Sequence, residues 1–107
     1  MYAQVVQGGA APDRRDEMNA AVRDHLIPAL QQEAGYAGAV NLENRDTGHG
    51  MMITFWDTEA EAAGMPTSPA FLQALGRIAM VSSGQREPIG IWRVNVLDFD
   101  QARGGVR

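Results

Sequence analysis

Apolar and polar residues alternate in some stretches of the chain and recur every three or four positions in others. Alternation is typical of strands with one buried face, and the three-to-four spacing is typical of helices. The alternating stretches lie at 2–7, 37–45, 50–57 and 89–99. The helical spacing fills 13–34, and it returns after Ser68 and Pro69 up to the Ser82–Gly84 loop. A short capped helix is expected at 59–63, because Thr58 and Glu61 form a capping-box pattern.

The first long helix has one strongly apolar face. Pro28 interrupts it, and a proline inside a helix should kink or locally unwind the backbone. His25 falls on the same side as the apolar residues, which are Met18, Ala21, Val22, Leu26, Ala29 and Leu30. The later helix is expected to bury Phe71, Leu72, Leu75, Ile78 and Ala79.

The predicted order is β-α-β-β-α-β, with a hairpin turn at 46–49, which is the split arrangement of ferredoxin-like α+β folds. Such an antiparallel sheet carries both helices on one face. The more apolar strand positions are expected under the helices, and they are Ala3, Val5, Val40, Leu42, Met52, Thr54, Trp56, Trp92, Val94 and Val96. The opposite face would hold Met51, Ile53, Phe55, Ile91 and Leu97. These are too many large apolar groups for water, so we expect a homodimer through this face.

Composition narrows the possibilities. The 107 residues suit one domain, expected at 1–100, followed by a flexible tail at 101–107. There is no cysteine, which removes disulfides and thiolate chemistry, and all nine basic residues are arginine, which removes Schiff-base chemistry. The net charge of −4 argues against a nucleic-acid partner. Neither a signal-like segment nor a membrane span is visible, so we expect a cytoplasmic protein without a membrane partner.

Several of these stretches resemble a known family. The hairpin at 44–59, ending in Trp56-Asp57-Thr58-Glu59, is similar to that of antibiotic biosynthesis monooxygenase (ABM) domain proteins. Ile-Pro-Ala-Leu at 27–30 and Gly-Tyr-Ala-Gly at 35–38 also match the family, although Ala34 stands where the family has proline. The resemblance spans nearly the whole chain, and its motifs are mostly structural. It implies a dimeric α+β barrel with a pocket between helices and sheet.

The resemblance leaves the activity open, because the family includes cofactor-free monooxygenases of aromatic polyketides, haem-degrading enzymes and members of unknown reaction. The haem-degrading branch needs an asparagine late in the first strand and a histidine in the later helix. This chain has Gln7 and Leu75-Gly76-Arg77 there, so haem degradation is not expected. The polyketide branch flanks its tryptophan with asparagine and tyrosine, whereas this chain has Met52 and Ala62. Trp56 is therefore the one residue of this chain that matches the site residues of these two branches.

Two residues are candidates for catalysis. Trp56 could stack on a planar ligand, although packing at the strand–helix junction is the commoner role of such a tryptophan. His25 could accept a proton near neutral pH, although a hydrogen-bonded structural histidine is the commoner case. The expected substrate-binding residues around them are Met52, Thr54, Phe71, Leu75 and Trp92.

The sequence thus predicts an ABM-type barrel that binds a small apolar or aromatic ligand. If it is an enzyme, the expected reaction is cofactor-independent oxygenation of a small aromatic or polyketide-like substrate. The residue His25 or a water would take a proton, and the resulting carbanion would react directly with O₂. The alternative is a non-catalytic ligand-binding or stress-related barrel. Neither a cofactor nor a metal is expected, because two histidines on separate elements do not make a ligand set. The substrate cannot be named from the sequence.

Overall fold

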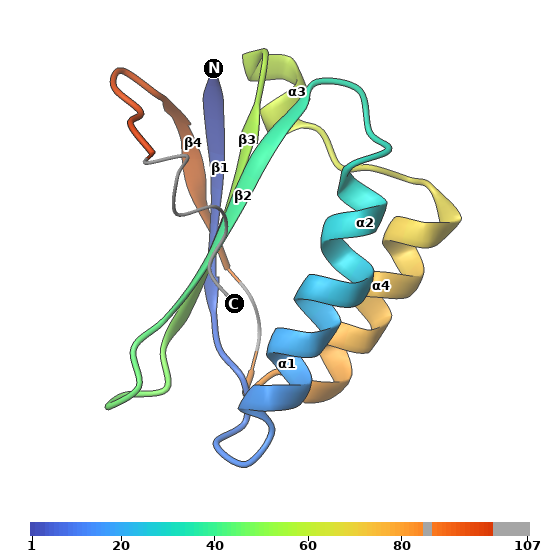
Figure 1. Ribbon diagram of the computed structural model, residues 1–107, viewed down its shortest axis with the longest axis vertical. Coiled ribbons are helices and arrows are strands. Elements are labelled where there is room, and N and C mark those ends of the chain that lie inside the picture. Colours follow the sequence, from blue (N-terminus) through green and yellow to red (C-terminus); the bar gives the residue numbers. More distant parts are fainter. Residues whose placement is uncertain (85–86, 100–107) are drawn as a thin grey trace.

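The computed structural model describes residues 1–84 and 87–99, in which a four-stranded sheet packs against a layer of helices (Figure 1). In chain order the elements are β1 (Tyr2–Gly8), α1 (Arg15–Ala21), a π-helical segment η1 (Val22–Leu26), α2 (Ile27–Leu30), β2 (Tyr36–Glu43), β3 (Gly50–Trp56), α3 (Glu59–Ala63), α4 (Pro69–Val81) and β4 (Glu87–Arg93). The strands are antiparallel in the order β2-β3-β1-β4. The predicted ferredoxin-like order is therefore confirmed. The expected tail at 101–107 lies outside the described residues.

Local signals in the sequence explain where the later elements begin. The hydroxyl of Ser68 accepts a hydrogen bond from the backbone N–H of Phe71, with Pro69 at the first position of α4. Thr58 and Glu61 cap α3 reciprocally, as their spacing predicts. α4 buries Phe71, Ala74, Ile78 and Val81, whereas Leu72 and Ala79 are exposed. The expectation that those two residues lie on the buried face is therefore wrong.

The first long helix continues through Pro28 instead of ending there. The distortion lies just before the proline, in η1, where the backbone N–H of Ile27 bonds to the carbonyl of Val22. A π turn holds more residues than an α turn, so each residue rotates less around the axis. Val22 and Leu26, four residues apart, still share the buried face, whereas His25 is turned outward and exposed. The expected position of His25 on the apolar side is wrong for this reason.

Cross-strand pairing shows which residues share a face of the sheet. Met52, Thr54 and Trp56 face the helices, as predicted. Their partners on β1 are Val6, Gln4 and Tyr2, and their partners on β2 are Asn41, Ala39 and Tyr36. Ile91 also packs against the helix-side core. In β1, β2 and β4, the residues that face the helices are therefore the alternate set to the one predicted.

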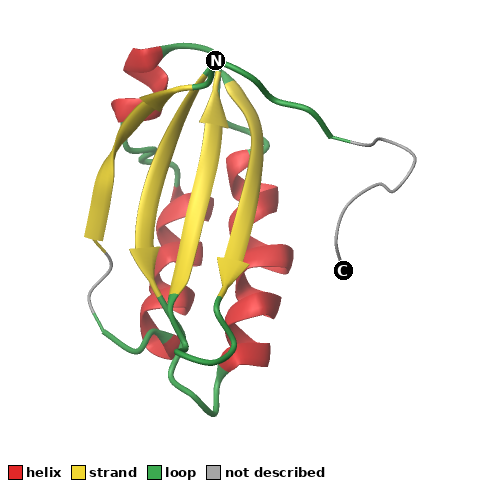
Figure 2. Ribbon diagram, turned by 90° about the vertical axis from the view of Figure 1, so that its left-hand side faces the viewer, coloured by secondary structure: helices red, strands yellow, loops and turns green. Residues whose placement is uncertain are grey.

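The side of the sheet away from the helices is an open apolar face. Figure 2 shows this side of the sheet in front of the helices. Because both faces are apolar, apolarity alone does not indicate which face lies inside. The open face carries Ala3, Val5, Val40, Leu42, Met51, Ile53, Phe55 and Trp92. Leu42 is 46% exposed, Met51 36% and Trp92 57%. We name this surface the open sheet face.

The last strand is shorter than the sequence predicts. β4 ends at Arg93 instead of Phe99, and residues 94–99 leave on the side of the sheet away from the helices (Figure 1). The backbone N–H of Val94 still bonds to the carbonyl of Met1, where the neighbouring strand begins. Beyond that point β1 offers no further partners, so Val96 is 86% exposed and Phe99 61%. Among the described residues, no helix is long and apolar enough to cross a membrane.

Candidate functional site

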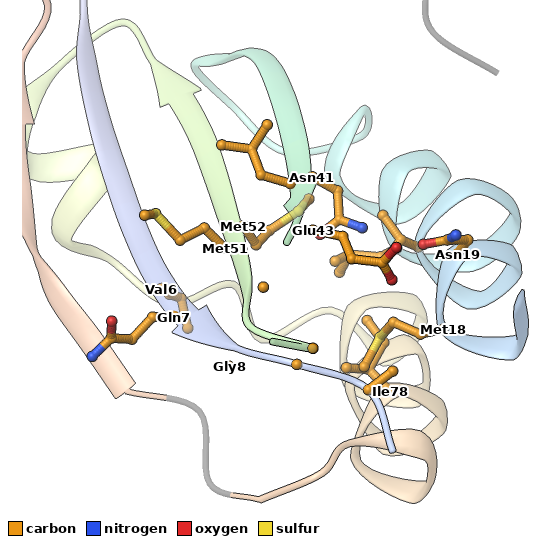
Figure 3. Close-up of a pocket in the computed structure, with 17 residues that line it drawn as sticks. Val6, Gln7, Gly8, Met18, Asn19, Asn41, Glu43, Met51, Met52 and Ile78 are labelled. Atoms are coloured by element: carbon orange, nitrogen blue, oxygen red, sulfur yellow. The ribbon is translucent and has the colours of Figure 1, made fainter. Parts of the chain in front are cut away.

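A small cavity of about 60 Å³ lies between α1, η1 and the end of the sheet where β1 finishes (Figure 3). Figure 3 shows Met51 and Gln7 pointing away from the helices, so they border the cavity through their backbone. The wall on the helix side is apolar. It is formed by Met18, Val22, Leu26 and Ile78, and Met52 faces it from β3. The cavity is thus enclosed by apolar groups on its inner side.

The mouth of the cavity is polar and lies beside β2, at the edge of the sheet. Asn41 and Glu43 project from β2 toward the helix, where Asn19 lies across from them (Figure 3). The residues Asn19 and Asn41 are solvent-exposed, whereas the Glu43 side chain is 27% exposed. The mouth therefore offers two amides and one carboxylate to anything that enters from solvent.

Two arginines surround the carboxylate at the mouth. The Nε of Arg15 lies 3.9 Å from one oxygen of Glu43, and the Nε of Arg45 lies 3.9 Å from the other. The Arg15 and Glu43 side chains are only 26% and 27% exposed, whereas Arg45 is 85% exposed. Arg15 also donates to the backbone carbonyl of Arg45 at 3.1 Å, which ties the start of α1 to the β2–β3 turn. At these distances and exposures, each ion pair contributes about 1 kcal/mol or less.

Glycines form the narrow end of the cavity, where β1, β3 and the turn approach closely. A Cβ on Gly9 would collide with the carbonyl oxygen of Gly48. A Cβ on Gly50 would lie 3.1 Å from the carbonyl oxygen of Gly8. The backbones can pack this tightly only because these positions lack side chains.

Trp56 and Thr54 lie toward the opposite end of β3. Trp56 is 4% exposed and Thr54 6%, and the indole N–H donates to the threonine hydroxyl at 2.8 Å. The Tyr36 ring meets the indole edge-on, with centroids 5.8 Å apart, and burial raises the pKa of Tyr36. Trp56 lies about 13 Å along the strand from Met52, and it packs in the core with Phe71 and Ala62.

The seven residues expected to form one pocket are therefore dispersed. Met52 alone of them lines the cavity, while Trp56, Thr54 and Phe71 are buried and Leu75 packs beside them. His25 is exposed on the outer side of the helix and does not line the cavity. Trp92 is on the open sheet face, where its indole lies over Gly90.

The polar residues at the mouth were not singled out from the sequence. A signal existed for two of them, because Asn41 and Glu43 occupy alternate positions of one strand and therefore share a face. Asn19 and Arg15 had no such signal. Their importance depends on how α1 packs against the hairpin, which brings distant parts of the sequence together; the Arg15–Arg45 hydrogen bond spans 30 positions. Within residues 1–84 and 87–99, no group of three His, Cys, Asp or Glu side chains is placed to hold a metal ion.

Comparisons with known proteins show which solved structures have a similar fold. No protein-family model matches the chain, and no curated protein matches it. Solved structures do match, among them a proposed antibiotic biosynthesis monooxygenase from Bordetella bronchiseptica (TM-score 0.76, 11% identity, 89% of this chain and 97% of that one). A similar protein from Nitrosomonas europaea has a TM-score of 0.71 and 16% identity over 90% of this chain and 100% of that one.

A third match is SnoaB from Streptomyces nogalater, described as a cofactor-independent oxygenase (TM-score 0.68, 15% identity, 90% of this chain and 94% of that one). The resemblance to ABM-domain proteins is thereby confirmed at the level of the fold. At such low identities the likeness does not extend to the reaction or the substrate.

Proposed function

We propose that the chain binds a small aromatic ligand in the cavity between α1, η1 and the sheet, and acts on it as a cofactor-independent oxygenase. The observation that carries the proposal is the character of this cavity, with an apolar inner wall and a polar mouth. Such a combination is the usual form of a small-ligand site. The fold it shares with SnoaB, described as a cofactor-independent oxygenase, supports the reaction class.

The size of the cavity favours a single ring. A benzene-sized guest occupies a cavity on the order of 150 Å³, whereas this cavity has a volume of about 60 Å³. Met18 and Met52 are unbranched and flexible, so their displacement could supply part of the difference. The polar end of the ligand could remain in the open mouth. A multi-ring polyketide is the less favoured substrate.

The simplest reaction for such a site converts a phenol and O₂ into a quinone and water. The phenol loses its hydroxyl proton, and the electron-rich ring carbon opposite the oxygen forms a bond with O₂. Loss of the ring proton and cleavage of the O–O bond then release water and leave a carbonyl. The protein would hold the ring, exclude bulk water from its apolar part and accept protons at the mouth.

A non-catalytic binding protein is the second candidate. It is favoured by the Trp56–Thr54 hydrogen bond, which engages the indole N–H that could otherwise orient a substrate, and by the outward position of His25. Oxygen consumption distinguishes the two functions.

We also propose that the protein is a homodimer through the open sheet face. Its large apolar side chains, including Leu42, Met51 and Trp92, are partly exposed in the single chain. A second copy would cover the same residues in both subunits, as a two-fold axis requires. This face spans all four strands of the sheet (Figure 2).

The proposed function is tested by filling the cavity. Val22→Trp should abolish binding of p-cresol and catechol in calorimetry. It should also abolish any oxygen uptake with catechol, in which the ring carbon opposite each hydroxyl carries a hydrogen. Leu72→Trp introduces the same side chain at an exposed position of α4 and should change neither. If wild-type binds catechol without consuming oxygen, the binding protein is supported. If Val22→Trp binds as tightly as wild-type, this cavity is not the ligand site.

A further inference from the structure

The carboxylate of Glu43 is held at the mouth without being hydrogen-bonded. Both neighbouring Nε atoms lie 3.9 Å away, which is beyond hydrogen-bonding distance. Among the described residues, no hydrogen bond to this carboxylate is found, although Glu43 and Arg15 are both largely covered. Its oxygens are therefore available to a ligand.

The carboxylate oxygens of Glu43 lie where a ligand in the cavity can reach them. Glu43 borders the cavity, and Figure 3 shows its side chain directed toward the helix, as is that of Asn41 two residues earlier. A ring resting on Met18, Val22 and Met52 would extend its polar end into this region. Glu43 would then be among the first polar groups it meets.

A carboxylate selects a particular kind of polar group. An ionised carboxylate only accepts hydrogen bonds, whereas the amides of Asn19 and Asn41 both donate and accept. The amides therefore tolerate a carbonyl, an ether or a hydroxyl. Glu43 favours a ligand with a donor hydrogen and disfavours one that presents only acceptors.

We propose that Glu43 determines ligand specificity by accepting a hydrogen bond from a hydroxyl on the ring in the cavity. This rests on the proposed ligand-binding function of the same cavity. Arg15 is a positioning residue, because its hydrogen bond to the carbonyl of Arg45 fixes the guanidinium beside the Glu43 carboxylate.

The test compares two ligands of nearly equal shape, p-cresol and 4-methylanisole, which differ in having or lacking the donor hydrogen. Wild-type should prefer p-cresol about tenfold in calorimetric Kd, the low end for a hydrogen bond to a charged group. In Glu43→Gln the preference should fall to about threefold, and in Glu43→Leu it should vanish. Glu59→Gln, an exposed carboxyl at the start of α3, should keep the wild-type preference.

Binding of 4-methylanisole is the internal check, because it should be no weaker in Glu43→Gln than in wild-type if the cavity is intact. Equal binding of the two ligands by wild-type, or an unchanged preference in both Glu43 variants, would overturn the role of Glu43 while leaving ligand binding in place. Failure of wild-type to bind either compound would overturn the binding function and this inference together.

Discussion

The indole N–H of Trp56 donates a hydrogen bond to the hydroxyl of Thr54, two residues earlier on the same face of β3. Both side chains are buried, so each satisfies a polar group that would otherwise lack a partner. The pair therefore stabilises the core at the end of the sheet remote from the cavity.

Thr54→Val should consequently destabilise the protein without weakening cavity binding. Valine keeps the shape but leaves the indole N–H buried and unpaired, which costs about 1–3 kcal/mol in free energy of unfolding. Trp56→Phe should lower stability comparably. Urea denaturation and p-cresol titration measure the two effects. Weaker p-cresol binding by stably folded Trp56→Phe would instead place this residue in the ligand site.

Gly35 should be the least replaceable glycine in the connection to β2. Its φ is +80°, and a Cβ there would collide with the carboxylate of Glu61, which is engaged in capping α3. Gly35→Ala should lower the free energy of unfolding by about 1 kcal/mol or more. Gly76→Ala is the control, because no atom lies within 4 Å of its Cβ position in α4. It should stabilise by roughly 0.5–1 kcal/mol, and equal effects of the two changes would contradict the argument.

Tyr36 should make stability depend on pH in the alkaline range. Burial raises its pKa in the folded state, so the unfolded chain loses the phenolic proton first. The free energy of unfolding is therefore unaffected by the ionisation of Tyr36 below the ordinary tyrosine pKa of about 10, and it falls as pH rises from there toward the higher pKa of Tyr36 in the folded protein. Unfolding measured at about pH 9 and 11 should show a smaller loss for Tyr36→Phe than for wild-type. Parallel losses would exclude this contribution.

Dimerisation should depend on Ile53, near the middle of the open sheet face. Ile53→Asp would place a charge in a dry contact, and should give monomer or aggregate. Thr47→Asp in the exposed turn should remain dimeric, and so should leave the mass in light scattering unchanged. A native-like wild-type monomer at micromolar concentration would disprove the dimer.

The fold was predictable because its signals are local. The Ser68 and Thr58 caps and the turn at 46–49 each act within a few residues, and they divide the chain correctly. Strand registers were not predictable from apolarity, since both faces of the sheet are apolar. β4 was predicted too long because its apolar residues continue past the point where β1 begins.

The cavity was harder to predict than the fold. His25 was assigned by regular helical spacing, which η1 alters over a single turn. Trp56 was predicted to contact a ligand because it has a large ring and an N–H donor, but that N–H is hydrogen-bonded to Thr54 inside the core. At the mouth, Glu43 and Arg15 come from separate elements. The spacing of residues within one element cannot predict a contact between two elements.

The position of β2 at the sheet edge has a consequence for how this protein can diverge. Asn41 lies on that strand at an exposed position and Glu43 at a partly exposed one, while the buried cluster around Trp56 is elsewhere. Substitutions on exposed positions usually change stability by less than about 0.5 kcal/mol. Selection can therefore vary the mouth through single mutations without a compensating change in the core, so related sequences could acquire new ligand preferences while keeping the same scaffold.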